Sequence, residues 1–429
     1  MMEEQFADRH SADPTEWRFP WFLCSMLFAA TALSLLDRQV FSMLAPRIMT
    51  EFGISNTVYS HVVFAFQLSY TAMFALGGYV LDRVGTRRGL ALSLGLWSLA
   101  SAAHAFVHGA LGLGSARFVM GLGEGAVFPA ATKGATELAP PSRRTFAIGF
   151  ANGGSALGAV VAPPLTAILA MHFGWRGAFV CTGLLGGIWL TLWLMARYKP
   201  HAAKPKLAPK PVAWKSLLQD VRLRKILFAR FLFDPVFYFY MFWIPQFLTR
   251  ERHLSLQQIG SLIWIPFLVL GFSQVFGGRL ADGLVNARTS PVESKRLLLT
   301  IAALVTPVSW VVSLSTNTAW AIALMSVLML AHGVWITNYL GLLSDLFERD
   351  AIATIVGLTG TAGGIGGMLS TLLIGPTVDK FSFAPVFALS GILYPLALLM
   401  VRSASTCSKP VIGPQLSATS EPTSDGLPL

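Results

Sequence analysis

Apolar residues follow one another along this chain in long runs, separated by short charged or glycine- and proline-containing turns. A helix needs about 20 apolar residues to cross a bilayer. Runs of this kind lie near residues 19–44, 57–81, 89–108, 112–137, 145–171, 176–196, 224–248, 258–281, 297–314, 318–345, 352–378 and 383–401. A membrane β-barrel would instead show short alternating strands. The pattern therefore predicts an all-α integral membrane protein with 12 transmembrane helices.

The composition agrees with this class of protein and limits which partners are expected. Only 12% of the 429 residues are charged, against about 25% in a soluble domain. The net charge of +11 could suggest nucleic acid, but the basic residues lie between the apolar runs, as the positive-inside rule describes. We therefore expect a lipid membrane and no nucleic acid as partner. The three cysteines show no metal or redox spacing, so no metal site is expected.

The basic residues also predict an orientation. They gather in the turns after every second run, and the connection 197–225 adds nine more. Those in the turns after runs 2, 4, 6 and 8 are Arg83, Arg87, Arg88, Arg143, Arg144, Arg279, Arg288, Lys295 and Arg296. Both termini should therefore be cytoplasmic. The first 18 residues lack the basic start and short apolar core of a cleavable signal peptide.

One connection divides the chain into halves. The stretch "ARYKPHAAKPKLAPKP" (196–211) is basic and proline-rich, which predicts an extended linker. The stretch "WKSLLQDVRLRK" (214–225) has apolar residues at helical spacing, so it is either a surface helix or an ordinary loop. The predicted order is a cytoplasmic tail (1–18), a six-helix bundle (19–197), the linker (198–222), a second bundle (223–402) and a disordered tail (403–429).

The two halves resemble each other in sequence. The stretch "ALGGYVLDR" (75–83) aligns with "VFGGRLADG" (275–283), and "ELAPPSRRTFAIG" (137–149) aligns with "DLFERDAIATIVG" (345–357). Chance matches between apolar sequences are the alternative, but the blocks occur in the same order. The repeat indicates two six-helix halves in the same orientation, as in duplicated transporters.

The turn "GYVLDRVGTRR" (78–88) carries a recognisable pattern. A glycine, three residues, Asp-Arg, a second glycine and paired basic residues resemble the signature of the major facilitator superfamily. Its members here are Gly78, Asp82, Arg83, Gly85, Arg87 and Arg88. We interpret this as a structural and gating motif. Gly78 should let two helices approach, and Asp82 should cap the next helix or pair with a base.

Further stretches resemble the anion:cation symporter family within that superfamily. They are "LDRQVFSMLAP", "ARFVMGLGEGAVFPA", "GWRGAFV", "RFLFDPVFYFYMFWIP" and "GLTGTAGGIGG". The likeness covers nearly all of residues 20–402 and is greatest to the bacterial hexuronate branch. It implies proton-coupled uptake of a small organic anion, such as galacturonate or a related sugar acid, across a bacterial inner membrane. No cofactor is expected beyond the coupling ion, which is H⁺, with Na⁺ as the alternative.

Charged residues inside the apolar runs are the main candidates for a site. Asp37 and Arg38 interrupt the first run, and Arg117 and Glu124 lie seven residues apart in the fourth. A charge at a helix centre costs about 2.5–3.5 kcal/mol, so such residues usually face a cavity and find partners. Adjacent residues on a helix point about 100° apart. We therefore expect Asp37 to pair with Arg117 and Arg38 to face the cavity.

These four charges have a chemistry suited to anion transport. A guanidinium offers a planar, bidentate replacement for the hydration of an anion. A desolvated carboxylate favours its protonated form, so it can carry a proton. The family resemblance implies substrate contact for Arg38, proton coupling for Glu124 and Asp37, and a switchable partner in Arg117. A neutral structural charge network is the alternative.

Other polar residues on apolar helices are secondary candidates. Those chosen for substrate binding are Tyr70, Gln67, Ser155, Trp335, Asn338 and Thr359. Hydrogen bonding between helices explains such residues equally well. His332 shares the tenth run with Trp335 and Asn338. Arg230 and Asp234, four residues apart, are predicted to form a structural or gating pair.

Together these features predict a secondary transporter that acts as a monomer by alternating access. The sequence has no nucleotide-binding loop and no nucleophile–base motif, so an enzyme is not expected. Two other classes remain as alternatives. An exporter or antiporter of an organic anion or drug would share the fold, and a non-transporting sensor would normally add a signalling domain.

Overall fold

The computed structural model describes residues 20–140, 143–198, 217–286, 289–348 and 351–405. Over these residues the chain is helical apart from turns and one isolated bridge between Asn286 and Thr289. Ten of the helices are long and apolar enough to cross a membrane by length and composition. The prediction of an all-α membrane protein is confirmed.

The N-terminal half contains six of the predicted apolar runs. Its elements are α2 (Trp21–Phe52), α3 (Asn56–Val84), α4 (Thr86–Ala103), η1 (His104–Phe106), α5 (Ala110–Glu124), α6 (Val127–Leu138) and α7 (Arg144–Met195). The fourth run is broken into α5 and α6 directly after Glu124. The long α7 holds the fifth and sixth runs, joined at Gly174, whose φ of 69° favours glycine. These two features explain why ten membrane-length helices stand against twelve predicted runs: α7 holds two runs, and the broken fourth run is not among the ten.

The C-terminal half repeats the arrangement. Its elements are α9 (Val221–Arg252), α10 (Leu256–Leu262), α11 (Trp264–Leu284), α12 (Pro291–Val305), α13 (Val308–Leu314), α14 (Thr318–Leu346), α15 (Ile352–Lys380) and α16 (Ala384–Ser405). Two predicted boundaries shift. Residues 221–225, placed in a possible surface helix, form the start of α9, and residues 403–405, placed in a disordered tail, complete α16. Residues 1–19, 199–216 and 406–429, with the predictions made for them, lie outside the described residues.

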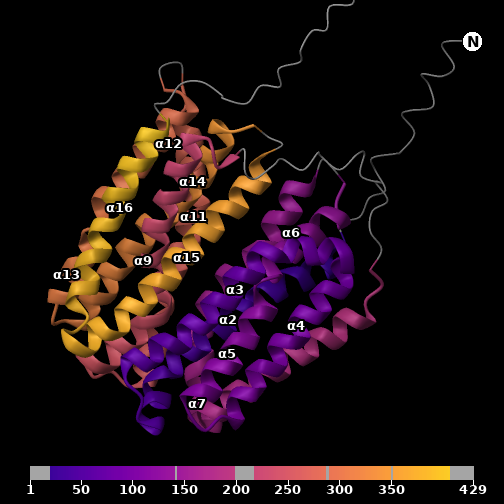
Figure 1. Cartoon of the computed structure of the whole chain (residues 1–429), viewed down its shortest axis with the longest axis vertical. Helices are drawn as coiled ribbons and strands as arrows, with labels where there is room; N and C mark the ends of the chain where they lie inside the picture. The colour runs from indigo at the N-terminus through magenta and orange to yellow at the C-terminus, as the bar shows by residue number, and fades with distance from the viewer. Residues whose placement is uncertain (1–19, 141–142, 199–216, 287–288, 349–350, 406–429) are drawn as a thin grey trace, which may run out of the picture.

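The two halves lie side by side and meet along one seam. Figure 1 shows the first half in indigo and magenta and the second in rose, orange and yellow. At the seam α3 packs against α15, α2 against α9, and α7 against α10 and α11. By the sequence repeat, α2 and α9 are equivalent helices, and the contact of α3 with α15 is the counterpart of that of α11 with α7. A site between the halves is therefore built from both repeats.

The sequence repeat is visible in the packing. A Cβ on Gly77 would lie 3.3 Å from the Ala126 Cα, and one on Gly277 would lie 3.1 Å from the Val334 Cα. Glycine therefore permits the same close approach in each half. The prediction named Gly78 for this role and was wrong by one residue, because no atom lies within 4 Å of a Cβ built there.

The signature turn braces the N-terminal half. Asp82 accepts a hydrogen bond from Lys133 at 2.6 Å, and the Arg83 guanidinium lies 4.2 Å from the Tyr79 ring centroid. Arg87 donates to the main-chain oxygens of Leu194 and Ala196. These contacts tie α3 to α6, and the start of α4 to the end of α7.

One end of the seam is closed by a hydrogen-bonded cluster. The Asp379 carboxylate, at the end of α15, accepts four hydrogen bonds from the first turn of α3. They come from the Asn56 N and Nδ2 (3.1 and 2.7 Å) and the Thr57 N and Oγ1 (2.8 and 2.7 Å). Gln246 donates to Asn56, and Tyr59 donates to the Phe242 carbonyl. The charge pattern predicts that this is the outer end.

Candidate functional site

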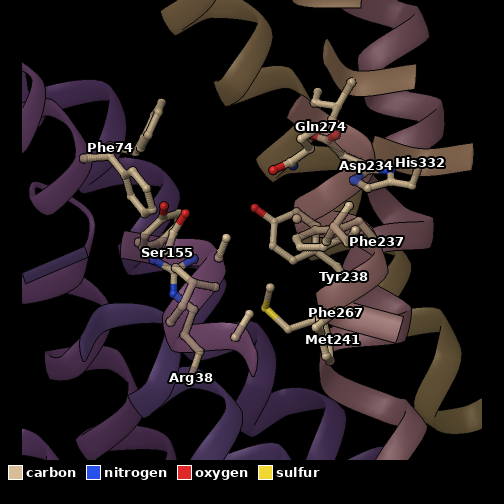
Figure 2. A pocket seen from close by; sticks show the side chains of 18 of the residues that line it. Arg38, Phe74, Ser155, Asp234, Phe237, Tyr238, Met241, Phe267, Gln274 and His332 are labelled. Atoms are coloured by element: carbon tan, nitrogen blue, oxygen red, sulfur yellow. The ribbon is translucent and has the colours of Figure 1, made fainter. Parts of the chain in front are cut away.

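A central cavity of about 280 Å³ lies between the halves. It is close to the lower limit of about 300–1,000 Å³ for small-molecule pockets, which suits a ligand of sugar-acid size. Figure 2 shows its two walls facing each other. The N-terminal wall includes Leu35, Arg38, Tyr70, Phe74, Phe128 and Ser155. The C-terminal wall includes Arg230, Asp234, Phe237, Tyr238, Gln274 and His332.

Arg38, on α2, is the charged residue of the N-terminal wall. Its Nε donates to Glu124 Oε2 at 2.6 Å, and its Nη2 donates to Ser34 Oγ at 3.2 Å. Ser34 in turn donates to the same Glu124 oxygen at 3.1 Å. The Tyr70 ring lies 4.1 Å from the guanidinium carbon. Arg38 Nη1 has no hydrogen-bond partner among the described residues, so it is available to a ligand.

Glu124, the last residue of α5, is fully buried behind Arg38. Its Oε2 accepts the hydrogen bonds from Arg38 and Ser34. Its Oε1 is buried without a hydrogen-bond partner in the described part of the chain. A buried, unpaired carboxylate oxygen is costly. Oε1 is therefore the atom of this carboxylate for which the described residues supply no partner.

Asp37 and Arg117 do not form the predicted pair. Asp37 accepts hydrogen bonds from Trp97 Nε1 (3.0 Å) and Ser101 Oγ (3.4 Å), both on α4. Arg117 is fully buried between the rings of Phe41 and Phe66, at 4.3 and 4.4 Å. The prediction failed because neutral donors on α4 can satisfy Asp37, and aromatic faces can hold a guanidinium.

Arg117 therefore has no carboxylate partner within the described residues. Its Nη1 contacts the Met120 sulfur at 3.2 Å, while Nε and Nη2 are buried without hydrogen bonds. Such a buried cation is unfavourable unless another state supplies a partner. Its predicted role as a switchable partner stays a prediction.

Three glycines clamp α5 around Glu124. A Cβ on Gly121 would lie 2.1 Å from Ser69 Oγ, and one on Gly125 would lie 2.6 Å from the Tyr70 carbonyl oxygen, both on α3. A Cβ on Gly123 would lie 2.7 Å from a main-chain oxygen of α4. This glycine clamp (Gly121, Gly123 and Gly125) fixes Glu124 between two helices.

The secondary candidates divide into two groups. Tyr70 and Ser155 line the cavity, as expected for contact with a ligand. Gln67 is buried outside the cavity lining, with both amide atoms unpaired among the described residues. The hydroxyl of Tyr70 makes no described hydrogen bond and can meet a ligand.

The remaining candidates contact protein instead. Trp335 is fully buried against Phe233 and Tyr394, and Asn338 donates to the carbonyls of Gly277 and Val334. None of these atoms lines the cavity. The binding role predicted for Trp335 and Asn338 thus gains no support from the geometry.

The pair Arg230–Asp234 lies on the cavity wall. Arg230 Nε donates to Asp234 Oδ2 at 3.0 Å, and its Nη1 reaches Thr359 Oγ1 at 3.4 Å. Thr359 is buried behind Arg230, outside the lining. The sequence predicted a structural or gating pair and not a cavity wall, because position along a helix does not show which face meets the other half.

Several lining residues were missed. Tyr238 and Phe237 stand in a run of aromatic residues where no single one is distinguishable, and Gln274 is an isolated amide in an apolar run. The isolated amide was the available signal, because polar side chains in membrane helices usually have a partner or a cavity.

Two bundles of membrane helices around a charged central cavity define a membrane transporter, not an enzyme. Residues 27–371 match the sequence profile of the Major Facilitator Superfamily. The chain belongs to this superfamily.

Named relatives and solved structures agree with this assignment. The chain is 29% identical over 400 residues to the hexuronate transporter of Escherichia coli K12, covering 89% of this chain and 93% of that one. It is 30% identical over 324 residues to the galacturonate transporter of Dickeya chrysanthemi, covering 71% and 93%. Its fold resembles a D-xylose–proton symporter with a TM-score of 0.75 at 15% identity, over 90% and 97% of the two chains.

Proposed function

We propose that this protein imports a sugar acid together with protons, with a hexuronate such as galacturonate as the expected substrate. The observation that carries the proposal is Arg38, which faces the central cavity while its Nε is held by the buried Glu124. The relatives named above transport hexuronate and galacturonate, and their similarity extends over most of the chain.

Arg38 is suited to hold the substrate carboxylate. Its guanidinium is fixed by Glu124 and Ser34 on one side and by the Tyr70 ring on another. The free Nη1 presents N–H groups to the cavity without further ordering, which lowers the entropic cost of binding. Tyr70 and Ser155, on the same wall, supply hydroxyls for the sugar.

Competition for Arg38 provides a means of proton coupling. The ionised Glu124 neutralises Arg38, so an arriving carboxylate would meet no net positive charge. A proton on Glu124, with the unpaired Oε1 as its site, leaves Arg38 free to bind the substrate. Substrate and proton therefore favour each other's binding, as symport requires.

We infer the orientation from the charge pattern. With both termini in the cytoplasm of a bacterial cell, the Asp379 cluster closes the outer end, and the structure is an inward-facing state. The protein then acts in the inner membrane, and the two halves rock about the cavity to open it to either side.

The Glu124→Gln variant tests the coupling. Glutamine resembles the protonated acid in shape and charge, so the variant should bind galacturonate and exchange it across proteoliposome membranes. It should not accumulate galacturonate from an imposed pH gradient, because no proton is released inside. Wild-type accumulation by this variant would remove Glu124 from the mechanism.

A matched control comes from the other end of α2. Glu51 also pairs with an arginine, Arg176, at 2.5 Å, but both side chains are more than a third exposed and lie outside the cavity. Glu51→Gln should retain both exchange and accumulation. If neither the wild type nor the control binds galacturonate, the proposed substrate is wrong.

A further inference from the structure

Three cations from three helices meet at one end of the C-terminal half. Lys225 lies near the start of α9, Arg296 near the start of α12 and Arg402 in the last turn of α16. Figure 1 shows α12 beside the upper end of α16, and α16 also packs against α9. Arg402 Nη2 donates across to Thr300 Oγ1 of α12 at 2.9 Å. Lys225, Arg296 and Arg402 form what we call the basic cluster, at the end that the charge pattern predicts to be cytoplasmic.

Two of these cations hold the last turn of α16 through serines. Lys225 Nζ donates to the Ser403 hydroxyl at 2.5 Å and lies 3.4 Å from the Ser403 carbonyl oxygen. Arg296 Nε donates to Ser405 Oγ at 2.6 Å. The basic cluster therefore joins the ends of α9, α12 and α16 at one place.

The partners of Lys225 and Arg296 carry no charge. Among the described residues, no carboxylate oxygen lies within 4 Å of either side chain. Arg296 Nη2 is in addition buried without a hydrogen-bond partner in the described ranges. Cations that are partly removed from water are stabilised by an anion. The basic cluster can therefore accept an anion from outside the chain.

The acids nearby are engaged elsewhere. Glu293, the one acid of α12, accepts a hydrogen bond at 2.8 Å from the main-chain N–H of the residue that caps the helix. Two more acids at this end have basic partners already. Asp220 pairs with Arg222, and Asp345 pairs with Lys295, each at 2.7 Å. These carboxylates therefore leave the charge of the basic cluster uncompensated.

Below the basic cluster the same helices present apolar side chains to the outside. Figure 1 shows that α16 lies on the side of the C-terminal half that faces away from the N-terminal half. The exposed residues are three or four positions apart, so they form one stripe on each helix, leading from the basic cluster toward the middle of the membrane. They are Leu297, Ile301 and Leu304 on α12 and Ile392, Leu396 and Leu399 on α16.

We propose that the basic cluster binds the phosphate of an anionic phospholipid, whose acyl chains lie along the two apolar stripes. Phosphate oxygens accept hydrogen bonds from ammonium and guanidinium groups. Anionic lipids of the cytoplasmic leaflet attract basic residues at the membrane surface. The occupant is a lipid and not a soluble anion, because the stripes continue from the cations into the membrane. The inference is independent of the transported substrate, since the basic cluster lies outside the cavity lining.

The test compares two lipids that have the same acyl chains and differ in headgroup charge. Native mass spectrometry of the full chain gives the dissociation constants of the first bound dioleoyl phosphatidylglycerol and dioleoyl phosphatidylcholine. The wild type should favour phosphatidylglycerol by at least about tenfold. One basic residue at the surface contributes about a factor of five toward an anionic lipid. Lys225→Gln and Arg296→Gln should each lower the preference by about that factor, and the double variant should lose most of it.

Two further variants serve as controls. Arg88 and Arg197 are exposed at the same end of the N-terminal half, and Arg88→Gln/Arg197→Gln removes the same charge as the double variant. It should retain the wild-type preference. Ser403→Ala/Ser405→Ala removes the hydroxyl partners but keeps both cations, so it should retain the preference too. Its loss there would contradict direct binding of the lipid by the cations.

Three other results would overturn the proposal. They are equal wild-type affinities for the two lipids, a preference unchanged in both single variants, and displacement of phosphatidylglycerol by excess inorganic phosphate. The last would show that the basic cluster is a site for a soluble anion, because phosphate lacks acyl chains. Each result leaves the binding of galacturonate untouched, so it is distinguishable from a failure of the proposed function.

Discussion

Replacing Asp379 by alanine should shift the protein toward the state that is open at the predicted outer end. This one side chain accepts all four hydrogen bonds from the first turn of α3. Two of the donors are main-chain N–H groups that have no partner within the helix. A third main-chain N–H group of this turn, that of Val58, donates to the Ser55 hydroxyl. Asp379 thus acts as a helix cap supplied by the opposite half.

The magnitude follows from capping energies, because Asp379 is exposed. Loss of a cap costs about 0.5–2 kcal/mol, and a negative charge at a helix N-terminus contributes about 0.3–1 kcal/mol. The closed state should therefore lose about 1–3 kcal/mol relative to the open one. That corresponds to a shift of roughly 5- to 150-fold in the equilibrium between the two states.

Exchange of labelled galacturonate in oriented vesicles measures this shift. When the binding-competent state is rare, the apparent dissociation constant equals the intrinsic constant divided by the fraction of that state. The half-saturating concentration at the predicted outer face should thus fall by the same factor in Asp379→Ala. Lys380→Ala, one residue away, should leave it unchanged. An unchanged value in Asp379→Ala would show that these hydrogen bonds do not hold the closure.

Three further substitutions test the N-terminal half. Arg38→Lys keeps the charge but cannot contact Glu124, Ser34 and a ligand together, so galacturonate binding should weaken at least tenfold; calorimetry within twofold of wild type would refute the anchor. Tyr70→Phe keeps the ring beneath Arg38 and removes the hydroxyl, so affinity should fall by about 1 kcal/mol, or roughly fivefold; an unchanged dissociation constant would limit Tyr70 to packing. If Asp37 also loads a proton, a monoanion moves with net charge +1, and uptake should respond to a potassium–valinomycin potential by about 2.3 kcal/mol per 100 mV. In that case Asp37→Asn should abolish the response, and voltage-insensitive wild-type uptake would argue for one proton.

The sequence was sufficient to predict the helices and the polar residues of the N-terminal wall. Membrane spans are visible because each requires about 20 apolar residues, and Arg38 stands out as a charge within such a run. Partners were harder to predict. Counting residues from a helix end gives depth, but it does not give the rotation that turns Glu124 toward Arg38. Neutral partners such as Trp97 carry no charge signal at all.

The glycine clamp has a consequence for how the protein can vary. A Cβ built on Gly121, Gly123 or Gly125 would lie only 2.1–2.7 Å from the nearest atom of a neighbouring helix. Gly114 and Gly149, in contrast, have open space around them. A mutational scan should therefore show a band of positions around Glu124 that rejects even alanine. Lineages of this transporter could then acquire new cargo mainly by exchanging residues on the C-terminal wall, while the N-terminal wall stays almost fixed.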